Sequence, residues 1–346
     1  MDEPAIRLKP ISFDEIEGWA ADDHAAALAA LQRSCRKKFA GNAACKDALA
    51  LGDNPGREAA RRFFEANYVP HRFEGVPPGL VTGYYEPEVS GSREKSETFH
   101  VPVYARPDDI VQVTPDVLRA RYNDRLSVMR KSGEELVPYY TRAEIDSGAL
   151  EGRGLELLYL DDPVELFFMQ IQGSGRVRLP DGSWVRLGYA AKNGHSYTSI
   201  GRLLAERGEK APGGLTMDGL KWWLRADPKR GQALMHENAS YVFFRELPQG
   251  EAGEGPVGAQ GVPLTPGRSL AVDASYHALG TPVFVTAPDL AAGGAPFRRL
   301  MVAQDVGSAI KGLQRGDIFF GTGDEAGALA GTTKHKARFY VLLPKD

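Results

Sequence analysis

From residue 79 onward, short β-type runs make up most of the sequence, and glycine, proline and aspartate separate them. The runs "GLVTGYYEP", "FHVPVYARP", "SLAVDAS" and "ARFYVLLP" are rich in β-branched and aromatic residues. Long helices do not alternate with them, which disfavours a doubly wound α/β fold and favours β-barrels. We expect further strands throughout residues 155–190, with a hairpin that turns at Asp181-Gly182.

The N-terminal part of the chain has a different pattern, which predicts helices. Alanine and leucine alternate there with charges at helical spacing, and Ser12 or Asp14 is the candidate cap of the first helix. Phe63 and Phe64 are expected to face inward. Helical stretches are expected at 13–39, 54–68, 196–209 and 216–238.

A chain of 346 residues is long for one domain, so we expect two. The fold class is predicted as mainly β with N-terminal helices. Residues 1–88 and 246–346 are expected to form one barrel with its helices. Residues 89–245 are expected to form a second β-barrel domain inserted between them, with a glycan groove between the two domains.

Charge and hydropathy exclude several classes of protein. The net charge is −3 and lysines and arginines are spread along the chain, which argues against nucleic-acid binding. No apolar run approaches the ~20 residues of a membrane helix. The opening "MDEPAIRLKP" has no charged-then-apolar leader, so we expect either a cytosolic protein or one whose leader has been removed.

The two cysteines, Cys35 and Cys45, lie close together in "SCRKKFAGNAAC". They are either two buried thiols or a disulfide between neighbouring helices, and the second reading implies an oxidising compartment. A zinc site is disfavoured, because only His24 lies nearby and structural zinc needs four ligands. The residues alone leave both readings open.

Three aspartates recur at the ends of apolar runs near the C-terminus: Asp273 after "SLAV", Asp305 after "LMVAQ" and Asp317 before "IFFGTG". A single aspartate in such a place more often caps a turn. Three in one β region point instead to carboxylates that converge on one mouth of a small barrel.

Other catalytic patterns fit poorly. "DVGS" has Val306 where aspartic proteases have threonine or serine, and it occurs once. "QGSGR" lacks the spacing of a nucleophile elbow, and "GTGDEAG" lacks the lysine of a phosphate-binding loop. The histidines form no metal-like pair, which leaves acid–base chemistry by carboxylates.

Several long motifs then show a specific likeness. "D…DVGSAIKG…GDIFFGTG…AG", "TGYYEPEVSGS", "VPVYARP", "FFMQIQGSGRVRLPDG" and "GYAAKNGHSYTSIGRLL" resemble the blocks of the membrane-bound lytic murein transglycosylase A family, in the family's order. The resemblance runs from about residue 70 to 340. It implies a double-psi β-barrel, the three-aspartate domain, with a second β-barrel domain inserted.

The resemblance also implies an activity. The family cleaves the β-1,4 bond between N-acetylmuramic acid and N-acetylglucosamine in peptidoglycan, and it leaves a 1,6-anhydro ring. The resemblance implies a monomeric enzyme without a cofactor or a metal. Its expected partners are peptidoglycan strands and cell-wall synthesis proteins, and its expected location is the periplasm, in association with the outer membrane. The lipid anchor of the family is not visible, since no cysteine precedes Cys35.

The family's motifs carry functional residues onto this chain. The catalytic aspartate falls on Asp317 and a supporting aspartate on Asp305. Tyr84 is expected to stack on a sugar face, while its neighbour Tyr85 packs in the core, or the reverse. The expected substrate-binding residues are Thr82, Tyr84, Gln172, Gly173, Ser174, Asn193 and Tyr197.

One carboxylic acid is enough for this reaction. A hydrolase needs a second carboxylate to attack or to activate water. A transglycosylase uses the sugar's own 6-hydroxyl, and intramolecular attack is worth on the order of 10⁵ M in effective concentration. Asp317 must start protonated, and burial beside Ile318, Phe319 and Phe320 is expected to raise its pKa.

Two other functions are compatible with the pattern. One is an expansin-like module that binds glycan without cleaving it, and the other is a glycosidase that uses water. The chain departs from the family in the turn after Asp273, where "SYHALG" has Ala278 in place of a proline and an unusual His277. We expect a looser turn there without an effect on catalysis.

Overall fold

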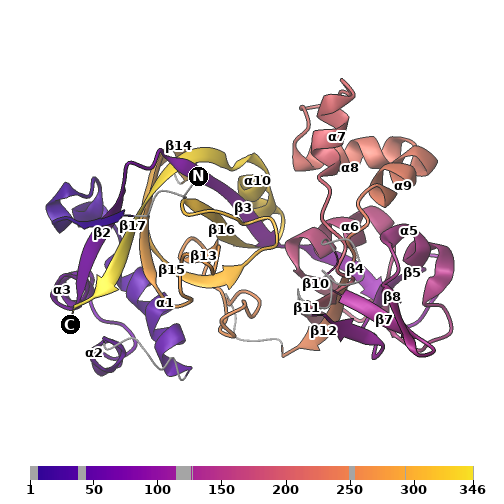
Figure 1. Cartoon of the computed structure of the whole chain (residues 1–346), viewed down its shortest axis with the longest axis horizontal. Coiled ribbons are helices and arrows are strands. Elements are labelled where there is room, and N and C mark those ends of the chain that lie inside the picture. The colour runs from indigo at the N-terminus through magenta and orange to yellow at the C-terminus, as the bar shows by residue number, and fades with distance from the viewer. Residues whose placement is uncertain are drawn as a thin grey trace. The chain divides into compact units, whose positions relative to one another are not determined.

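The computed structural model describes residues 7–37, 44–113, 126, 128–248, 254–292 and 294–345. The chain divides into two compact units. Unit 1 comprises Met1–Tyr85 and Gly250–Asp346, and unit 2 is the continuous segment Glu86–Gln249. Figure 1 shows both chain ends in unit 1, whose ribbon is indigo, orange and yellow. The fold is therefore mainly β with an inserted domain, as the sequence predicts.

Unit 1 is built on a closed barrel. Its strands are hydrogen-bonded in the order β17-β14-β15-β13-β16-β3, and β3 pairs back to β17. β13 runs parallel to β15 and antiparallel to β16. β2 and β1 continue the sheet outward from β17. The strands are β1 (Arg7–Pro10), β2 (Tyr68–Glu74), β3 (Gly79–Glu86), β13 (Ser269–Val272), β14 (Pro282–Ala292), β15 (Ala295–Val306), β16 (Arg315–Thr322) and β17 (Lys334–Pro344).

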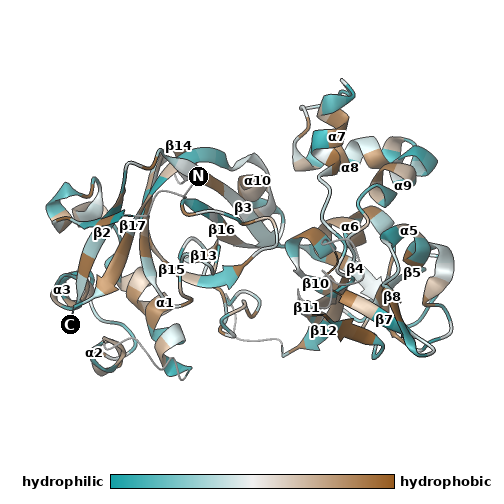
Figure 2. Cartoon of the chain, viewed as in Figure 1, coloured by the Kyte–Doolittle hydropathy of each residue, from teal (hydrophilic) through white to brown (hydrophobic). Residues whose placement is uncertain are grey.

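Aliphatic and aromatic side chains fill the barrel. Val81, Leu270, Met301, Ile318 and Phe339, each from a different strand, belong to one buried cluster. Figure 2 shows hydrophobic residues recurring along these strands. Alternate residues of a strand point to opposite sides, so each strand can fill the interior while its other face meets helices or solvent.

The N-terminal helices begin later than the sequence predicts. A single-turn helix starts after Ser12, whose backbone N–H donates to Glu15, and the long helix α1 starts only at His24. Its cap is Asp23, which accepts a hydrogen bond from the N–H of Ala26 at 3.2 Å. The helices of unit 1 are η1 (Phe13–Glu15), η2 (Trp19–Ala21), α1 (His24–Arg36), α2 (Cys45–Ala50), α3 (Arg57–Asn67) and α10 (Asp324–Thr332).

The helices between Phe13 and Asn67 pack on the barrel through a second core, whereas α10 lies against β16. Phe63 and Phe64 are buried, as predicted, in a cluster that includes Leu28 of α1 and Leu300 of β15. A buried ion pair joins the layers, because Arg268 contacts Asp22 at 2.8 Å and also donates to the backbone. The position of α1 against β15 is therefore fixed by both apolar packing and charge-assisted hydrogen bonds.

Unit 2 has its own sheet in the strand order β12-β11-β10-β4-β9-β5, and a bridge between Ala105 and Phe244 joins its two ends. A smaller sheet has the order β6-β7-β8. The strands are β4 (Glu88–Ser92), β5 (Val101–Tyr104), β6 (Ile110–Gln112), β7 (Val128–Ser132), β8 (Glu135–Pro138), β9 (Glu156–Leu160), β10 (Ser174–Arg178), β11 (Trp184–Lys192) and β12 (Val242–Leu247). The helices are α5 (Arg142–Glu144), η3 (Ile145–Ala149), α6 (Pro163–Gln172), α7 (Ile200–Glu206), α8 (Met217–Ala226) and α9 (Pro228–His236).

Within residues 155–190 the prediction is partly right. The hairpin of β10 and β11 exists, and Gly182 takes the left-handed conformation in its turn at φ 84°. The segment "PVELFFMQIQ", however, is helix α6 and not a strand. Asp162 accepts a hydrogen bond from Val164 N–H at the start of α6, Pro163 is its first residue and Gly173 ends it. These end signals override the apolar run.

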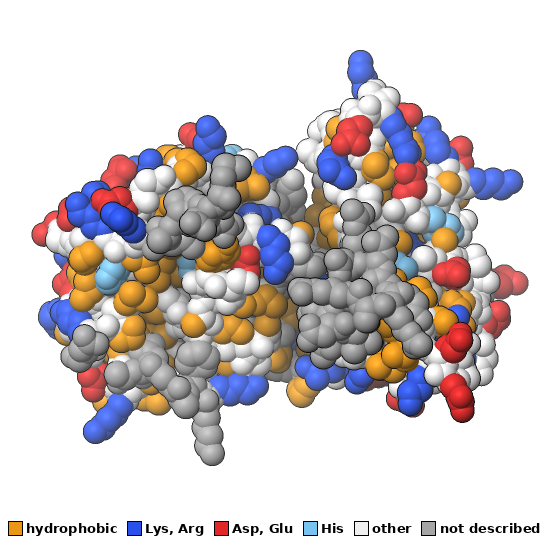
Figure 3. Space-filling view, viewed as in Figure 1, with side chains coloured by type: hydrophobic (Ala, Val, Ile, Leu, Met, Phe, Trp, Pro, Cys, Tyr) orange, Lys and Arg blue, Asp and Glu red, His pale blue; other side chains and the backbone are white. Residues whose placement is uncertain are grey.

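Charges of both signs are interspersed over the face that Figure 3 shows. None of the helices in the described part of the chain is long and apolar enough to cross a membrane.

Candidate active site

Asp305 and Asp317 lie on the two strands that flank β13. Ala271 of β13 is paired with Asp305 of β15 on one side and with Asp317 of β16 on the other. Residues that face each other across paired strands point to the same side of the sheet. The two carboxylates are thus brought to one face of the barrel wall, separated by a single alanine.

The neighbouring strand β3 holds both carboxylates. The hydroxyl of Thr82 donates to Oδ1 of Asp317 at 2.5 Å, and the hydroxyl of Tyr84 donates to Oδ2 of Asp305 at 2.9 Å. Residues i and i+2 of a strand point to the same side, which explains how one strand serves both. The four predicted residues of unit 1 therefore form one constellation.

Asp317 is half-buried, and burial raises the pKa of its carboxyl to about 6. The hydrogen bond from Thr82 and the charge of Arg315 oppose this rise in pKa, whereas the charge of Asp305 adds to it. Among the described residues, none donates a hydrogen bond to Oδ2 of Asp317. The carboxyl is held by one oxygen and carries a proton under mildly acidic conditions, as a general acid requires.

Arg315 is a part of the site that the sequence reasoning missed. Its Nη2 donates to the hydroxyl oxygen of Thr82 at 2.9 Å, and its Nη1 donates to the backbone carbonyl of Gly316. The guanidinium thus forces the Thr82 hydroxyl to point its proton toward Asp317. The signal in the sequence was only a basic residue two positions before the aspartate.

Asp305 is held by a different set of donors. Its Oδ1 accepts from the N–H of Ala259 at 2.9 Å and from its own following N–H, that of Val306, at 3.0 Å. Burial raises the pKa of Asp305, and the three donors, with Tyr84 as the third, oppose the rise. Among the described residues, the donors to Asp305 include Val306 but no backbone N–H of the turn at residues 307–311, so Asp305 is not a simple turn cap.

Asp273, the third aspartate of the pattern, does not join the other two. Its carboxylate accepts from Ser275 N–H at 3.1 Å and from Gly312 N–H at 2.9 Å, so it caps turns. The backbone donors lower its pKa. His277, in the same turn, is buried, and its Nε2 lies 2.7 Å from the carbonyl of Leu313. The turn is therefore tied down rather than loose.

Tyr84 does not offer its ring to a sugar. The side chain is 8% exposed, and the ring packs against Phe319 with centroids 5.3 Å apart. Burial and the charge of Asp305 raise the pKa of the Tyr84 hydroxyl, so it remains a donor. Tyr85 points elsewhere, toward Gly327 of α10. Tyr84 and Tyr85 therefore point to opposite sides of β3, as neighbours on a strand do. Tyr84 faces the site, where its hydroxyl positions the carboxylate of Asp305.

Three predicted residues of unit 2 are consecutive. Gln172 is the last residue of α6, Gly173 follows it in the left-handed conformation at φ 82°, and Ser174 begins β10. Ser174 is buried, while Gln172 and Gly173 are half-buried. A Cβ on Gly175 would lie 2.4 Å from the sulfur of Met169, so this glycine serves packing within unit 2.

Asn193 has a structural role. It is 0% exposed, and its amide nitrogen donates to the carbonyls of Tyr140 and Ala239, while its oxygen accepts from Tyr241 N–H at 2.9 Å. With both ends of its amide committed to backbone, it has no capacity left for a glycan. Tyr197 differs, since 40% of it is exposed.

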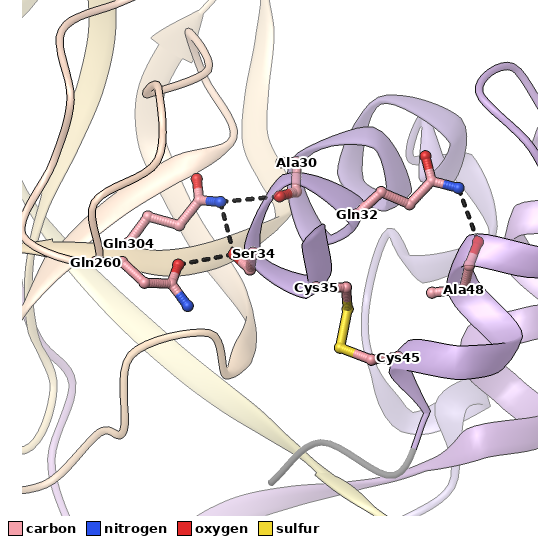
Figure 4. Close-up of a disulfide and its surroundings, with 8 residues drawn as sticks. All are labelled: Ala30, Gln32, Ser34, Cys35, Cys45, Ala48, Gln260 and Gln304. Carbon is pink, nitrogen blue, oxygen red and sulfur yellow. Dashed lines mark hydrogen bonds between the residues drawn. A yellow bond between two sulfur atoms is a disulfide. The ribbon is translucent and has the colours of Figure 1, made fainter. Parts of the chain in front are cut away.

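A disulfide joins Cys35 to Cys45 (Figure 4), which resolves the two readings of the sequence. It connects α1 with the first residue of α2. The sulfurs are outside the carboxylate constellation, yet α1 packs directly on β15, the strand that carries Asp305.

Comparison with known proteins places this geometry in context. The model of the MltA specific insert domain matches residues 80–245, and the model of the 3D domain matches residues 268–343. The membrane-bound lytic murein transglycosylase A of Vibrio cholerae is 35% identical over 270 residues, which are 76% of this chain and 65% of that protein. That of Escherichia coli K12 is 36% identical over 269 residues, 75% of this chain and 64% of that protein. The match thus spans just under two thirds of these relatives.

Solved structures match more completely. A membrane-bound lytic murein transglycosylase from Agrobacterium tumefaciens superposes with a TM-score of 0.88 and 38% identity, and 97% of each chain is covered. MltA from Neisseria gonorrhoeae gives a TM-score of 0.83 and 36% identity, with 99% of this chain and 92% of that chain covered. Escherichia coli MltA with bound chitohexaose gives 0.70 and 29%, with 100% and 94% covered.

Proposed function

Because the chain belongs to the membrane-bound lytic murein transglycosylase A family, we propose that it is a peptidoglycan lytic transglycosylase. It cleaves the β-1,4 bond between N-acetylmuramic acid and N-acetylglucosamine and leaves 1,6-anhydromuramic ends. The observation that carries the proposal is the half-buried carboxyl of Asp317, whose pKa burial raises to about 6 and whose Oδ1 accepts a hydrogen bond from Thr82.

Asp317 acts first as the acid. Its proton passes to the glycosidic oxygen as the bond from that oxygen to C1 of the muramic residue breaks. The carboxylate that results then accepts the proton of the 6-hydroxyl as O6 attacks C1, which closes the anhydro ring and regenerates the acid. A pKa of about 6 suits both steps, since the group must lose and regain one proton in each turnover.

Thr82, Arg315 and Asp305 prepare this acid. The Thr82 hydroxyl fixes one carboxyl oxygen, so the other faces the substrate. Asp305, held by Tyr84 and the N–H of Ala259, lies on the same face, and its charge helps to raise the pKa of Asp317. Thr82 and Tyr84 are thus proposed as residues that position the carboxylates, and not as direct sugar ligands.

The glycan contacts of unit 2 are part of the proposal. Four residues are proposed to contact sugar hydroxyl and N-acetyl groups: Gln172, Gly173, Ser174 and Tyr197. Of the Tyr197 side chain, 40% is exposed. Asn193 is not included, because its amide is committed to backbone. The glycan groove stays a prediction. So do the domain boundaries expected from the sequence, with residues 1–88 and 246–346 in the catalytic domain and residues 89–245 in the inserted domain.

The proposed setting follows from the family. We propose a cell-envelope location with peptidoglycan as the substrate, and more specifically the periplasm and the outer membrane. The Cys35–Cys45 disulfide supports an oxidising compartment. Cell-wall synthesis proteins as partners and a monomeric state are further expectations from the same resemblance.

Mass spectrometry of purified peptidoglycan after digestion tests the function. Muropeptides with anhydro ends support it, and Asp317→Asn should remove them. Reducing ends would instead identify a glycosidase that uses water, and binding without any cleavage would identify a glycan-binding module. A useful control is Asp273→Asn, since Asp273 caps turns in the same unit without contacting the two carboxylates.

A further inference from the structure

The glycine- and proline-rich segment 254–264 contributes a donor to the site. The N–H of its Ala259 reaches Oδ1 of Asp305 at 2.9 Å. The next N–H, that of Gln260, donates to the carbonyl of Gln304 at 3.0 Å. The segment folds back on itself, because Gly255 N–H donates to the carbonyl of Leu264 and Gly258 N–H donates to that of Val262. Leu264 belongs to a buried cluster with Tyr84 and Phe319, which anchors one end of the segment. The position of the Ala259 donor depends in addition on what holds the turn at residues 259–261.

The last turns of α1 hold it. The hydroxyl of Ser34 donates to Oε1 of Gln260 at 2.7 Å. Arg33 forms an ion pair with Glu254 at 3.3 Å, and Lys37 donates to the carbonyl of Gly261. We call Arg33, Ser34 and Lys37 the α1 clamp.

The same serine also reaches the strand of Asp305. Gln304 is the extra residue of a bulge in β15, because Leu270 pairs with Ala303 and Ala271 with Asp305. The buried amide of Gln304 donates to the hydroxyl of Ser34 and to the carbonyl of Ala30, both at 2.8 Å. A bulge re-aims a side chain and frees backbone groups, and here the freed carbonyl of Gln304 receives Gln260.

Figure 4 shows this arrangement beside the disulfide. Ser34 links Gln260 and Gln304, and the next residue along α1 is Cys35, bonded to Cys45 of α2. The last turn of a helix lacks partners for its carbonyls and tends to fray. A covalent link at Cys35 holds that turn, and with it the clamp, in one position.

We propose that the α1 clamp, with Ser34 at its centre and the Cys35–Cys45 disulfide behind it, positions Asp305 and its Ala259 donor for the reaction. This inference rests on the proposed function. Ser34 touches neither Asp305 nor Asp317. It acts through Gln260 on the segment that donates to Asp305, and through Gln304 on the strand that carries Asp305.

Ser34→Ala is the sharpest variant. It removes the hydroxyl that joins Gln260 to Gln304, and alanine is the best helix former, so α1 should remain folded. We expect kcat to fall about two- to tenfold with little change in KM, as the loss of one or two hydrogen bonds predicts. The pKa of Asp305, followed by NMR titration of labelled aspartate carboxyls, should rise, because the Ala259 N–H opposes that rise in the wild type. Ser34→Thr keeps the hydroxyl and should restore both values.

Gln32→Ala is the matched control on the same helix. The Gln32 amide donates to the carbonyls of Ala48 and Gly52, at 2.8 and 2.7 Å, and does not reach segment 254–264 (Figure 4). This variant should lose thermal stability while its kcat and its Asp305 pKa, measured below its melting temperature, remain those of the wild type. The double variant Cys35→Ser/Cys45→Ser should instead resemble Ser34→Ala in both readouts.

The proposal is overturned if Ser34→Ala keeps the wild-type kcat and Asp305 pKa, or if Gln32→Ala changes them equally. The titration separates this outcome from failure of the proposed function. A wild-type protein that cleaves no peptidoglycan but whose Asp305 pKa responds to Ser34→Ala and not to Gln32→Ala would refute the function while leaving the clamp intact.

Discussion

The hydroxyl of Thr82 donates a hydrogen bond to Oδ1 of Asp317 at 2.5 Å, between the adjacent strands β3 and β16. The direction of this bond is fixed, because the same hydroxyl oxygen accepts from Arg315 at 2.9 Å. A donor that favours the ionised form of Asp317 is thus set against burial, which favours the protonated form. The pKa of about 6 reflects this opposition, to which the charge of Arg315 adds a lowering effect and the charge of Asp305 a raising one.

Thr82→Val tests that balance, since valine matches the shape of threonine without the hydroxyl. The lost hydrogen bond stabilised the ionised carboxylate, so the pKa of Asp317 should rise by about 0.5–1 unit. A general acid works while protonated, and the alkaline limb of the pH–rate profile should therefore move to higher pH. Thr82→Ser should leave that limb in place, and a Val variant with an unmoved limb contradicts the assignment.

Asp317→Asn should reduce turnover by at least about 10²-fold, because the amide cannot donate and then accept the proton. Glycan binding, measured by calorimetry with peptidoglycan fragments, should be retained. Asp273→Asn is the comparison, and we expect it to lower the melting temperature with near-normal kcat. Near-normal turnover of Asp317→Asn would remove this residue from the mechanism.

Asp305→Asn should lower kcat by less than the ~10²-fold expected for loss of the acid itself. The charge of Asp305 raises the pKa of Asp317, so its removal should move the alkaline limb to lower pH. This is opposite to the shift expected for Thr82→Val. A variant that loses thermal stability but keeps the wild-type pH profile would show that Asp305 serves the fold alone.

The raised pKa of Asp317 also makes the free energy of unfolding depend on pH. The folded protein binds this proton more tightly than the unfolded chain, so the contribution to stability is present below pH 3.8 and is lost as pH rises through about 6. Asp317→Asn should therefore be more stable than the wild type at pH 7.5, by up to about 3 kcal/mol. Thermal melts of both proteins across pH 4 to 8 check this. A variant that is less stable than the wild type at pH 7.5 would contradict it.

The disulfide predicts a further result. Replacing both Cys35 and Cys45 by serine should destabilise the protein by about 2–3 kcal/mol, since the closed loop is short. Chemical denaturation of the oxidised protein and the double variant measures the difference. Quantitative thiol labelling of unreduced, denatured wild-type protein would show that the bond does not form.

The sequence predicts the strands on which Asp305 and Asp317 lie, because strand formation follows from local pattern. "LMVAQD" and "GDIFFG" place each aspartate in an apolar strand, and the short Gly- and Pro-bounded runs indicate barrels. Helix α6 was missed because its apolar run outweighed its end signals, Asp162-Pro163 before it and Gly173 after it. Those signals were available in the sequence.

Other parts of the site depend on pairing between distant strands. Ala259 contributes only a backbone N–H, which no side-chain pattern reveals, and it lies 46 residues from Asp305. Tyr84 was expected to face a sugar, but Phe319 covers its ring and its hydroxyl serves Asp305. Asn193 was expected to bind glycan, but its side-chain amide is hydrogen-bonded to the backbone of its own unit. In each case tertiary packing, and not residue type, decides the role.

Ala271 lies between the two carboxylates in the register of the sheet and is 3% exposed. It has no group that can react. The backbone ladder sets the spacing of the strands on either side of it, and its small methyl side chain adds little bulk between the two carboxylates. A branched or aromatic side chain at this position would compete with them for that space. The identity of a chemically silent residue is therefore as much a condition of the chemistry as the acids on either side of it.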